Sequence, residues 1–400
     1  MLIQNFHTKK SNQTVVKKGS KSLVYFTPLV NDSSKSTLTT ERKEMTSSNK
    51  RTKFAIATAS AVALVASMFA AASPAVAAGY TIGVSNSWAG NAWREEMVCA
   101  IKAQATNTGK YDKVLVSSRN TDAAGQSADI RSFITQKVNA IIVNSGDSSA
   151  NNPAMEEAIA AGIKVIAVDN SVTAKGVTLV SNDQVKYGAV GAEALAKAMN
   201  YKGNVLYMRG ISGAGADTDR DKGFKAVMAK YPKIKIAKEV FTNWDWAKGG
   251  ELANQLLVPG KFQGVWTSGI DYPVVEAMGK RLNGKYIPLV GADNNKFLQQ
   301  TASLASKGFV GIVVGNPAVI GGAALKVATD MLDGKSVAAT NFITPQAWTY
   351  KANKAQIDGQ YFKDQEATFS SAIKIPGYTN FTAAQLFRCK APQDSNDGSR

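Results

Sequence analysis

Histidine is almost missing from this 400-residue chain. The single histidine is His7, so residues 8–400 contain none. Ser-His-Asp and Cys-His catalysis both require an imidazole, and so do His-ligated zinc sites. The sequence therefore excludes these chemistries for most of the chain, and it indicates neither a metal site nor a cofactor.

Cysteine is nearly as scarce, with only Cys99 and Cys389. Their spacing is not C-x-x-C, which disfavours a reactive thiol pair. In an oxidising compartment two cysteines can form one disulfide. The sequence leaves open a structural bridge, which would tie the C-terminal tail to the first helix, and two unpaired thiols.

Long basic runs are also missing after residue 78. The formal net charge is +17, but residues 1–78 hold 11 Lys and Arg against 3 Asp and Glu, and so carry about half of the excess. Beyond residue 78 no run of Lys and Arg is longer than two. This distribution disfavours nucleic acid as a partner.

A secretory signal peptide is predicted at residues 45–78. Arg51 and Lys53 precede an apolar run over 54–72, and the small residues 75–78 supply an A-x-A end. A transmembrane anchor is the alternative, although alanines and serines dilute the run. No cysteine follows the expected cleavage site, so we expect a periplasmic protein without a lipid anchor. Residues 1–44 are expected to be disordered or untranslated.

From residue 79 onward, short apolar strands alternate with amphipathic helices. The segments 80–84, 140–143 and 164–168 are strand-like, and 92–106 and 124–137 are helix-like. The alternation restarts near residue 187 and continues to 332. Such a pattern predicts an α/β fold with two similar, doubly wound parallel-sheet lobes joined by short crossings.

Polar and aromatic residues follow most of the predicted strands. In parallel α/β sheets, ligands bind beyond the carboxyl ends of the strands. Carboxylates, amides and arginine can saturate sugar hydroxyls, and indole faces pack on the C–H patches of a sugar ring. The candidate ligand-binding residues are Trp88, Asn91, Trp93, Asp169, Asn170, Arg220, Trp244, Asp271, Asp293 and Asn316.

Residues 80–335 resemble the periplasmic sugar-binding proteins of the ribose type, which feed ABC importers. The resemblance rests on an ordered set of local matches. They are Ile82-Gly83-Val84-Ser85 with Asn91-Ala92-Trp93, Ala140 to Asp147, Ile163 to Asn170, Val180-Ser181-Asn182-Asp183, Arg220-Asp221-Lys222-Gly223-Phe224, and Val290-Gly291-Ala292-Asp293.

The resemblance implies a type I periplasmic-binding fold with a multi-strand hinge. The first lobe would comprise 79–182 and 316–340, and the second 183–315 and 341–400. It implies a monomer that binds a small carbohydrate between its lobes and presents it to an importer permease. Trp93 and Trp244 would stack on the sugar, while Asp169, Arg220 and Asp293 would bind its oxygens. Asn170 stands where ribose-type members commonly carry arginine, so the sequence does not name the sugar.

Three other functions compete with sugar binding as interpretations of this sequence. The same fold could bind another polar solute, such as a polyol, a cyclitol or a furanone signal. A glycoside-processing enzyme would need paired carboxylates, and Asp169 with Asp293 is the only pair we could offer. A sugar-responsive repressor would need a DNA-binding helix-turn-helix before the first lobe, and residues 1–78 offer none. We therefore expect a binding protein rather than an enzyme.

Two local interpretations complete the predictions. Trp244 and Trp246 flank one residue, so in an extended loop they should point opposite ways, with Trp244 facing the ligand. The segment 210–215 contains three glycines but lacks the spacing of a nucleotide fingerprint, and we interpret it as a flexible turn that leads to Arg220.

Overall fold

The computed structural model describes residues 79–90 and 92–389, which lie within one compact unit formed by residues 74–400. The predicted signal peptide at 45–78 and the extension at 1–44 lie outside the described residues. Within the described part, each helix is too short or too polar to cross a bilayer.

The first lobe is built on a six-stranded sheet. Its strands are β1 (Tyr80–Asn86), β2 (Tyr111–Ser118), β3 (Ala140–Asn144), β4 (Lys164–Val168), β5 (Thr178–Asn182) and β11 (Thr340–Ile343). Their order is β11-β5-β4-β3-β1-β2, and each neighbouring pair is parallel. The central strand β3 is fully buried because helices cover both faces of the sheet.

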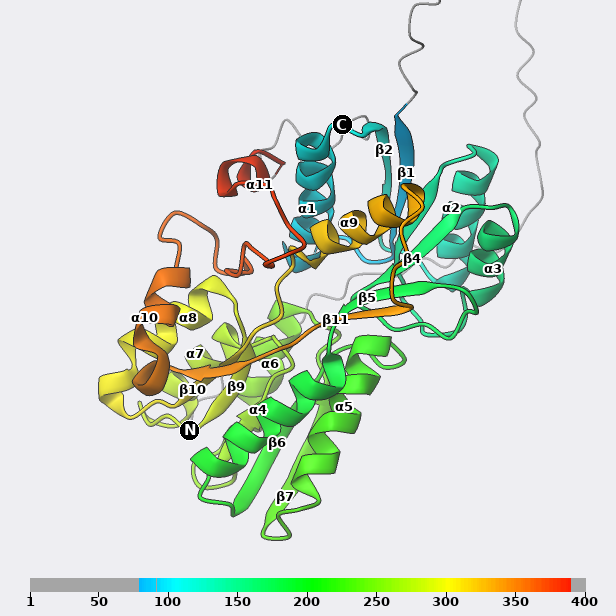
Figure 1. Cartoon of the computed structure of the whole chain (residues 1–400). Helices are drawn as coiled ribbons and strands as arrows, with labels where there is room; N and C mark the ends of the chain where they lie inside the picture. The colour runs from blue at the N-terminus through cyan, green and yellow to red at the C-terminus, as the bar shows by residue number, and fades with distance from the viewer. Residues whose placement is uncertain (1–78, 91, 390–400) are drawn as a thin grey trace, which may run out of the picture. The chain divides into compact units, whose positions relative to one another are not determined.

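Four helices cover this sheet: α1 (Ala92–Thr108), α2 (Ala123–Thr135), α3 (Asn152–Ala160) and α9 (Ile320–Leu332), and the short helix α11 (Ala383–Cys389) packs on α1. Figure 1 shows α1 and α9 on one side of the sheet and α2 and α3 on the other. The two sides hold separate apolar clusters, one around α1 and α9 and one around α2 and α3.

The second lobe repeats this plan. Its strands are β6 (Gly203–Arg209), β7 (Ile234–Phe241), β8 (Gly264–Trp266), β9 (Leu289–Ala292), β10 (Gly311–Val314) and β12 (Ala347–Thr349). Their order is β12-β10-β9-β8-β6-β7, and only the pair of β10 with β12 is antiparallel. The two similar sheets confirm the predicted α/β fold with two parallel-sheet lobes.

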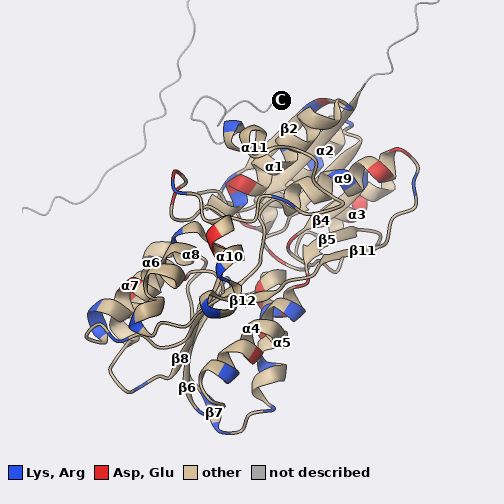
Figure 2. Cartoon of the chain, turned by 60° about the vertical axis from the view of Figure 1, so that its left-hand side comes forward, with Lys and Arg blue, Asp and Glu red and all other residues tan. Residues whose placement is uncertain are grey.

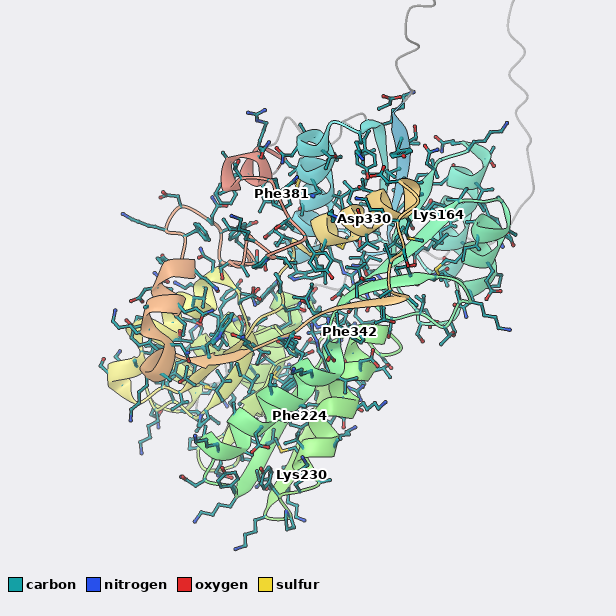
Figure 3. The ribbon with its side chains drawn as sticks, viewed as in Figure 1. Lys164, Phe224, Lys230, Asp330, Phe342 and Phe381 are labelled. Atoms are coloured by element: carbon teal, nitrogen blue, oxygen red, sulfur yellow. A yellow bond between two sulfur atoms is a disulfide. The ribbon has the colours of Figure 1, made fainter. Side chains whose placement is uncertain are left out.

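The helices of the second lobe are α4 (Gln184–Ala198), α5 (Gly215–Met228), α6 (Trp246–Leu256), α7 (Tyr272–Arg281), α8 (Asn295–Ser303), the short 3-10 helix at Ala305–Lys307, and α10 (Tyr350–Gln360). Helices α4 and α5 cover one face of the sheet, and the others cover the opposite face. Trp266 of β8 is only 1% exposed. It packs against Tyr207 and Phe224, and Phe224 is labelled within the second lobe in Figure 3.

Within the described residues, the chain passes between the two lobes four times. The crossings are at 182–184, 314–320, 343–347 and 360–383. The first three run between strand ends and elements next to them, as a multi-strand hinge requires. The fourth carries the tail from α10, which packs on α8 in the second lobe, to α11, which packs on α1 in the first.

Two parts of the tail lie elsewhere than expected. We assigned residues 341–400 to the second lobe, but β11 pairs with β5 at the edge of the first sheet, and α11 packs on the first-lobe helix α1. β11 stays in the first lobe because the third crossing begins only after it, and α11 lies there because the fourth crossing returns the chain after β12 and α10. Charged residues of both signs are scattered over many helices and loops (Figure 2).

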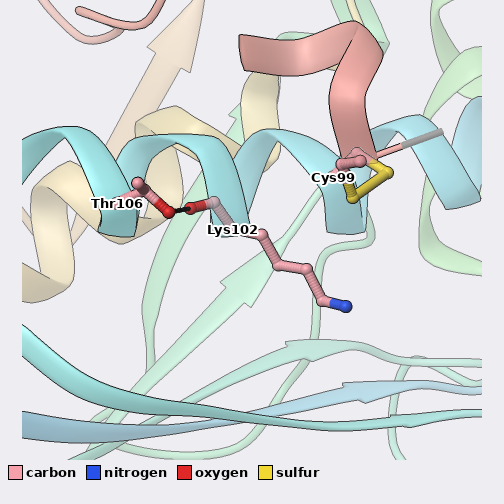
Figure 4. The surroundings of a disulfide bond; sticks show 4 residues. Cys99, Lys102 and Thr106 are labelled. Atoms are coloured by element: carbon pink, nitrogen blue, oxygen red, sulfur yellow. Dashed lines mark hydrogen bonds between the residues drawn. A yellow bond between two sulfur atoms is a disulfide. The ribbon is translucent and has the colours of Figure 1, made fainter. Parts of the chain in front are cut away.

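A disulfide joins Cys99 of α1 to Cys389 of α11, with Cα atoms 5.3 Å apart (Figure 4). This confirms the first of the two cysteine alternatives, a structural bridge that ties the tail to the first helix. The bridge spans a sequence separation of 290 residues. It therefore strongly reduces the conformational freedom of the unfolded chain. In the folded chain it fixes α11 on α1.

Replacing both Cys99 and Cys389 with alanine is expected to lower the free energy of unfolding by about 2–4 kcal/mol, because the unfolded chain regains the freedom that the bridge removes. Denaturant unfolding of both chains under non-reducing conditions measures this difference. Equal midpoints for the oxidised wild type and the double variant would contradict the prediction.

Candidate functional site

A cavity lies between the lobes, at the carboxyl ends of both sheets. We call it the inner cavity. Its volume is about 60 Å³. Its lining comes from residues that end or follow five strands, from the start of α1 and from α5. The lining residues are Trp93, Arg94, Asp169, Arg220, Trp244, Trp246, Ser268, Gly269, Ile270, Ala292, Asn294 and Asn316.

Three indole rings line the inner cavity, and two of them are fixed by their own N–H groups. Trp93 Nε1 donates to the carbonyl of Asn316 at 2.7 Å, and Trp244 Nε1 donates to the carbonyl of Ser268 at 3.1 Å. Both bonds fix the orientation of a ring, and the Arg220 guanidinium lies over the Trp244 ring, 5.8 Å from its centroid.

Trp246 occupies the first position of α6. Its ring stacks on Tyr272 of α7, with centroids 5.0 Å apart and an interplanar angle of 27°. Its Nε1 is buried and has no hydrogen-bond partner among the residues that the structure describes. A buried donor without a partner is costly, which makes this N–H a candidate ligand contact.

A buried carboxylate faces two guanidinium groups in the same cavity. Asp169 accepts a hydrogen bond from Gln184 Nε2 at 2.7 Å, and the Oε1 of Gln184 accepts one from Arg220 Nε at 2.8 Å. Burial raises the pKa of Asp169, while the charges of Arg220 and Arg94 and the bond from Gln184 oppose that rise. The arrangement presents one acceptor group and several donors to a ligand.

Arg94 also lines the inner cavity, and the sequence interpretation missed it. It is 4% exposed, and its Nη1 donates to Asn144 Oδ1 at 2.8 Å and to Asn86 Oδ1 at 3.1 Å. Burial lowers the pKa of Arg94 to about 10, against the opposing charge of Asp169. The sequence did contain one signal. A cation in the first turn of a helix interacts unfavourably with the helix dipole, so its presence there indicates a role other than stabilising the helix.

Three cavity-lining residues have left-handed backbone conformations. Asp169, Trp244 and Ser268 have φ angles of 63°, 52° and 53°. Each of them follows a strand, β4, β7 or β8. A non-glycine residue in this region costs of order 1–3 kcal/mol, and such strain concentrates at ligand sites. The conformation turns these side chains into the cavity instead of along the strand direction.

The ten predicted residues fall into three groups. Five line the inner cavity: Trp93, Asp169, Arg220, Trp244 and Asn316. Trp88 lies in a wider groove at the mouth of the cavity, and Asn91 lies outside the described residues. The remaining three, Asn170, Asp271 and Asp293, are buried but are not among the residues that line the cavity.

The three buried residues bond to protein groups. Asn170 donates to Asn144 Oδ1 at 2.6 Å and accepts from the backbone N–H of Ala216 at 2.9 Å. Asp271 caps α7 and also accepts from the N–H of Ala292 at 2.9 Å. These bonds satisfy the side chains without a ligand, so all three support the site from behind.

Asp293 has a similar supporting position. It accepts from the backbone N–H of Asn316 at 2.9 Å and from the Ser370 hydroxyl at 3.4 Å. Its own carbonyl accepts from Ser371 N–H and Oγ, both at 2.8 Å. The carboxylate thus links β9 to the β10 crossing and to the tail.

Two local interpretations need correction. Arg220 lies within α5, because the helix begins at Gly215 and not at residue 221, and so the expected flexible turn is shorter. Trp244 and Trp246 both line the inner cavity and do not point opposite ways. Their loop is not extended: Trp244 has a positive φ and Asp245 caps α6.

Stability is expected to fall as the pH rises from about 4 to about 6, in part through Asp293. Burial raises the pKa of Asp293 to about 6, above its ordinary value of 3.8. Between these values the folded chain holds a proton that the unfolded chain has lost, so raising the pH favours unfolding by up to about 3 kcal/mol. Denaturant unfolding at pH 4, 5 and 6 should show a shallower decline for Asp293→Asn, and equal slopes would contradict this assignment.

Among the described residues, no group of three His, Cys, Asp or Glu side chains is placed to hold a metal ion. What the lining offers is indole faces, one carboxylate, two guanidinium groups and amides. Such groups bind an uncharged molecule rich in hydroxyls.

Comparisons with known proteins agree with this chemistry. The family model described as periplasmic binding protein domain matches residues 82–336. The ribose import binding protein of Bacillus subtilis is 30% identical over 263 residues, which cover 65% of this chain and 84% of that protein. The xylitol-binding protein of Mycolicibacterium smegmatis is 28% identical over 228 residues, covering 55% of this chain and 64% of that protein.

Among solved structures, the periplasmic binding protein component of the arabinose ABC transporter from Shewanella sp. ANA-3 is similar with a TM-score of 0.60 and 25% identity. The match covers 70% of this chain and 95% of that one. That protein was solved bound to α- and β-L-arabinofuranose.

Proposed function

The chain belongs to the periplasmic binding protein family, and from this premise we propose that it captures a small carbohydrate in the inner cavity and delivers it to an ABC importer. The observation that carries the proposal is the lining of the cavity. Indole rings from both lobes accompany Asp169 and Arg220 at the carboxyl ends of two sheets. The sugar and sugar-alcohol ligands in the names of the relatives support this choice.

In this proposal Trp93 from the first lobe and Trp244 from the second pack on the faces of the sugar ring. Asp169 accepts hydroxyl protons, while Arg220 and Arg94 donate to ring or hydroxyl oxygens. Asn316 completes the lining from the β10 crossing, where its Oδ1 accepts from Asn182 Nδ2 at 2.9 Å. Asn91 remains a predicted contact, and Asn170, Asp271 and Asp293 hold the lining residues in place.

Binding and release follow from the two-lobe construction. The crossings let the lobes open so that solute enters, and a sugar that touches both lobes favours the closed state. The sugar leaves unaltered, because the cavity lining contains a single carboxylate and no paired acid and base. We propose that the protein acts as a periplasmic monomer without a lipid anchor, and that the importer permease recognises its closed lobes.

Isothermal titration against a panel of pentoses, hexoses and polyols tests the proposal. We expect one pentose or hexose to bind with a micromolar or lower Kd and to be recovered chemically unchanged by mass spectrometry. Tight binding of a polyol or cyclitol alone would establish the alternative ligand class. Binding of none of these compounds, or recovery of a cleaved product, would refute the proposed function.

A further inference from the structure

A wider groove opens directly above the inner cavity. We call it the outer groove. Its volume is about 640 Å³, within the range of small-molecule pockets and about ten times that of the inner cavity. The residues of the outer groove are Trp88, Ala89, Gly90, Arg94, Asn120, Ile211, Ser212, Asn243, Trp244, Asp245, Trp246, Ala247 and Lys248.

The two spaces are adjacent. Arg94, Trp244 and Trp246 line both of them, so a ligand seated in the inner cavity meets the outer groove across these three side chains. The inner cavity is small, with a volume of about 60 Å³. A larger ligand would therefore extend past Arg94 into the outer groove.

The outer groove has the chemistry of a sugar-binding surface. It carries an additional indole, Trp88, opposite the segment of Trp244 and Trp246 on the other lobe. The groove is also lined by Asn120 and Asn243, whose amides can bond to hydroxyls. Aromatic faces combined with amides suit a neutral carbohydrate ring better than a purely apolar group.

The Trp88 loop is held in place before any ligand arrives. The carbonyl of Trp88 accepts from Asn86 Nδ2 at 3.0 Å, and the next N–H, of Ala89, donates to Asn120 Oδ1 at 3.1 Å. The Arg94 guanidinium lies over the Trp88 ring, 5.0 Å from its centroid. A fixed indole binds a ring at lower entropic cost than a mobile one.

We propose that the outer groove binds a second sugar unit, glycosidically linked to the ring in the inner cavity, so that the preferred ligand is a disaccharide. This inference rests on the proposed function and deepens it. Trp88 forms the platform for the second ring on the first lobe. Arg94 lies at the junction, where it can donate to the oxygens on either side of the linkage.

Isothermal titration with matched pairs of sugars tests the proposal. The pairs are L-arabinose with α-1,5-L-arabinobiose, D-xylose with xylobiose, D-galactose with melibiose, and D-glucose with maltose or cellobiose. We expect at least one disaccharide to bind about tenfold tighter than its better monosaccharide unit. Trp88→Ala should abolish this advantage, so that the disaccharide binds no tighter than its better monosaccharide unit.

A second variant fills the groove instead of removing its platform. Ser212 is exposed and lines only the outer groove, so Ser212→Trp should fold normally and block the second ring. The matched control for Trp88→Ala is Tyr201→Ala, at an exposed tyrosine outside both spaces. It should change neither the monosaccharide Kd nor the disaccharide Kd.

The proposal is overturned if monosaccharides bind and no matched disaccharide binds more tightly, or if both groove variants keep the disaccharide advantage. If neither member of any pair binds, the proposed function fails and the second subsite fails with it. The monosaccharide titrations thus separate the two failures.

Discussion

Asp169→Asn is expected to weaken sugar binding by about 100-fold or more. Asp169 is the one carboxylate in the lining of the inner cavity, and it lies near Arg94 and Arg220. The substitution removes charge-assisted bonds to sugar hydroxyls, each worth about 1.5–3 kcal/mol, and leaves two buried guanidinium groups without their counter-charge. Isothermal titration with the best sugar from the panel measures the loss.

The matched control is Asp364→Asn, at an exposed carboxylate outside the cavity lining, and it should leave the Kd unchanged. A thermal melt of both variants shows whether the fold persists. If Asp169→Asn melts as a folded protein and binds within threefold of the wild type, Asp169 does not contact the ligand.

Gly223→Ala is expected to lower the free energy of unfolding by about 2–3 kcal/mol and to weaken binding at least tenfold. A Cβ at Gly223 would lie 1.9 Å from the carbonyl oxygen of Val185, so α4 and α5 could not keep their present spacing. Overpacking of this kind costs about 1–3 kcal/mol. Arg220 lies one turn earlier on α5, and its shift would break the bond to Gln184.

Gly359→Ala is the matched control. Gly359 lies on α10 with no atom near its would-be Cβ, so alanine should be neutral or stabilise the helix by about 0.5–1 kcal/mol. Denaturant unfolding and titration of both variants test the pair. Comparable stability of Gly223→Ala and wild type would show that the two helices tolerate wider spacing, and the account of Arg220 placement would then be wrong.

The sequence predicted the architecture well where burial is complete. Strands such as β3 and β4 are apolar runs because helices cover both of their faces, and that pattern is legible without a structure. The tail elements were missed for the opposite reason. β11 and β12 have four and three residues, only partly buried or exposed, and such short edge strands carry little hydrophobic signal.

The site was predicted only in part, because a polar residue after a strand has two possible uses. It can face the cavity, as Asp169 does, or bond to protein groups, as Asp271 and Asp293 do. Backbone conformation decides between these uses, and the positive φ of Asp169 is not readable from the sequence. Arg94 was missed because it lies in the first turn of a helix and not in a loop after a strand. It places a second guanidinium in the lining beside Arg220.

A crystal structure of the purified protein with its bound sugar tests the central claim most directly. We predict density for one intact sugar ring between Trp93 and Trp244, with its hydroxyls on Asp169 and Arg220. Density for the sugar at any other place, with the inner cavity left to solvent, would contradict the account.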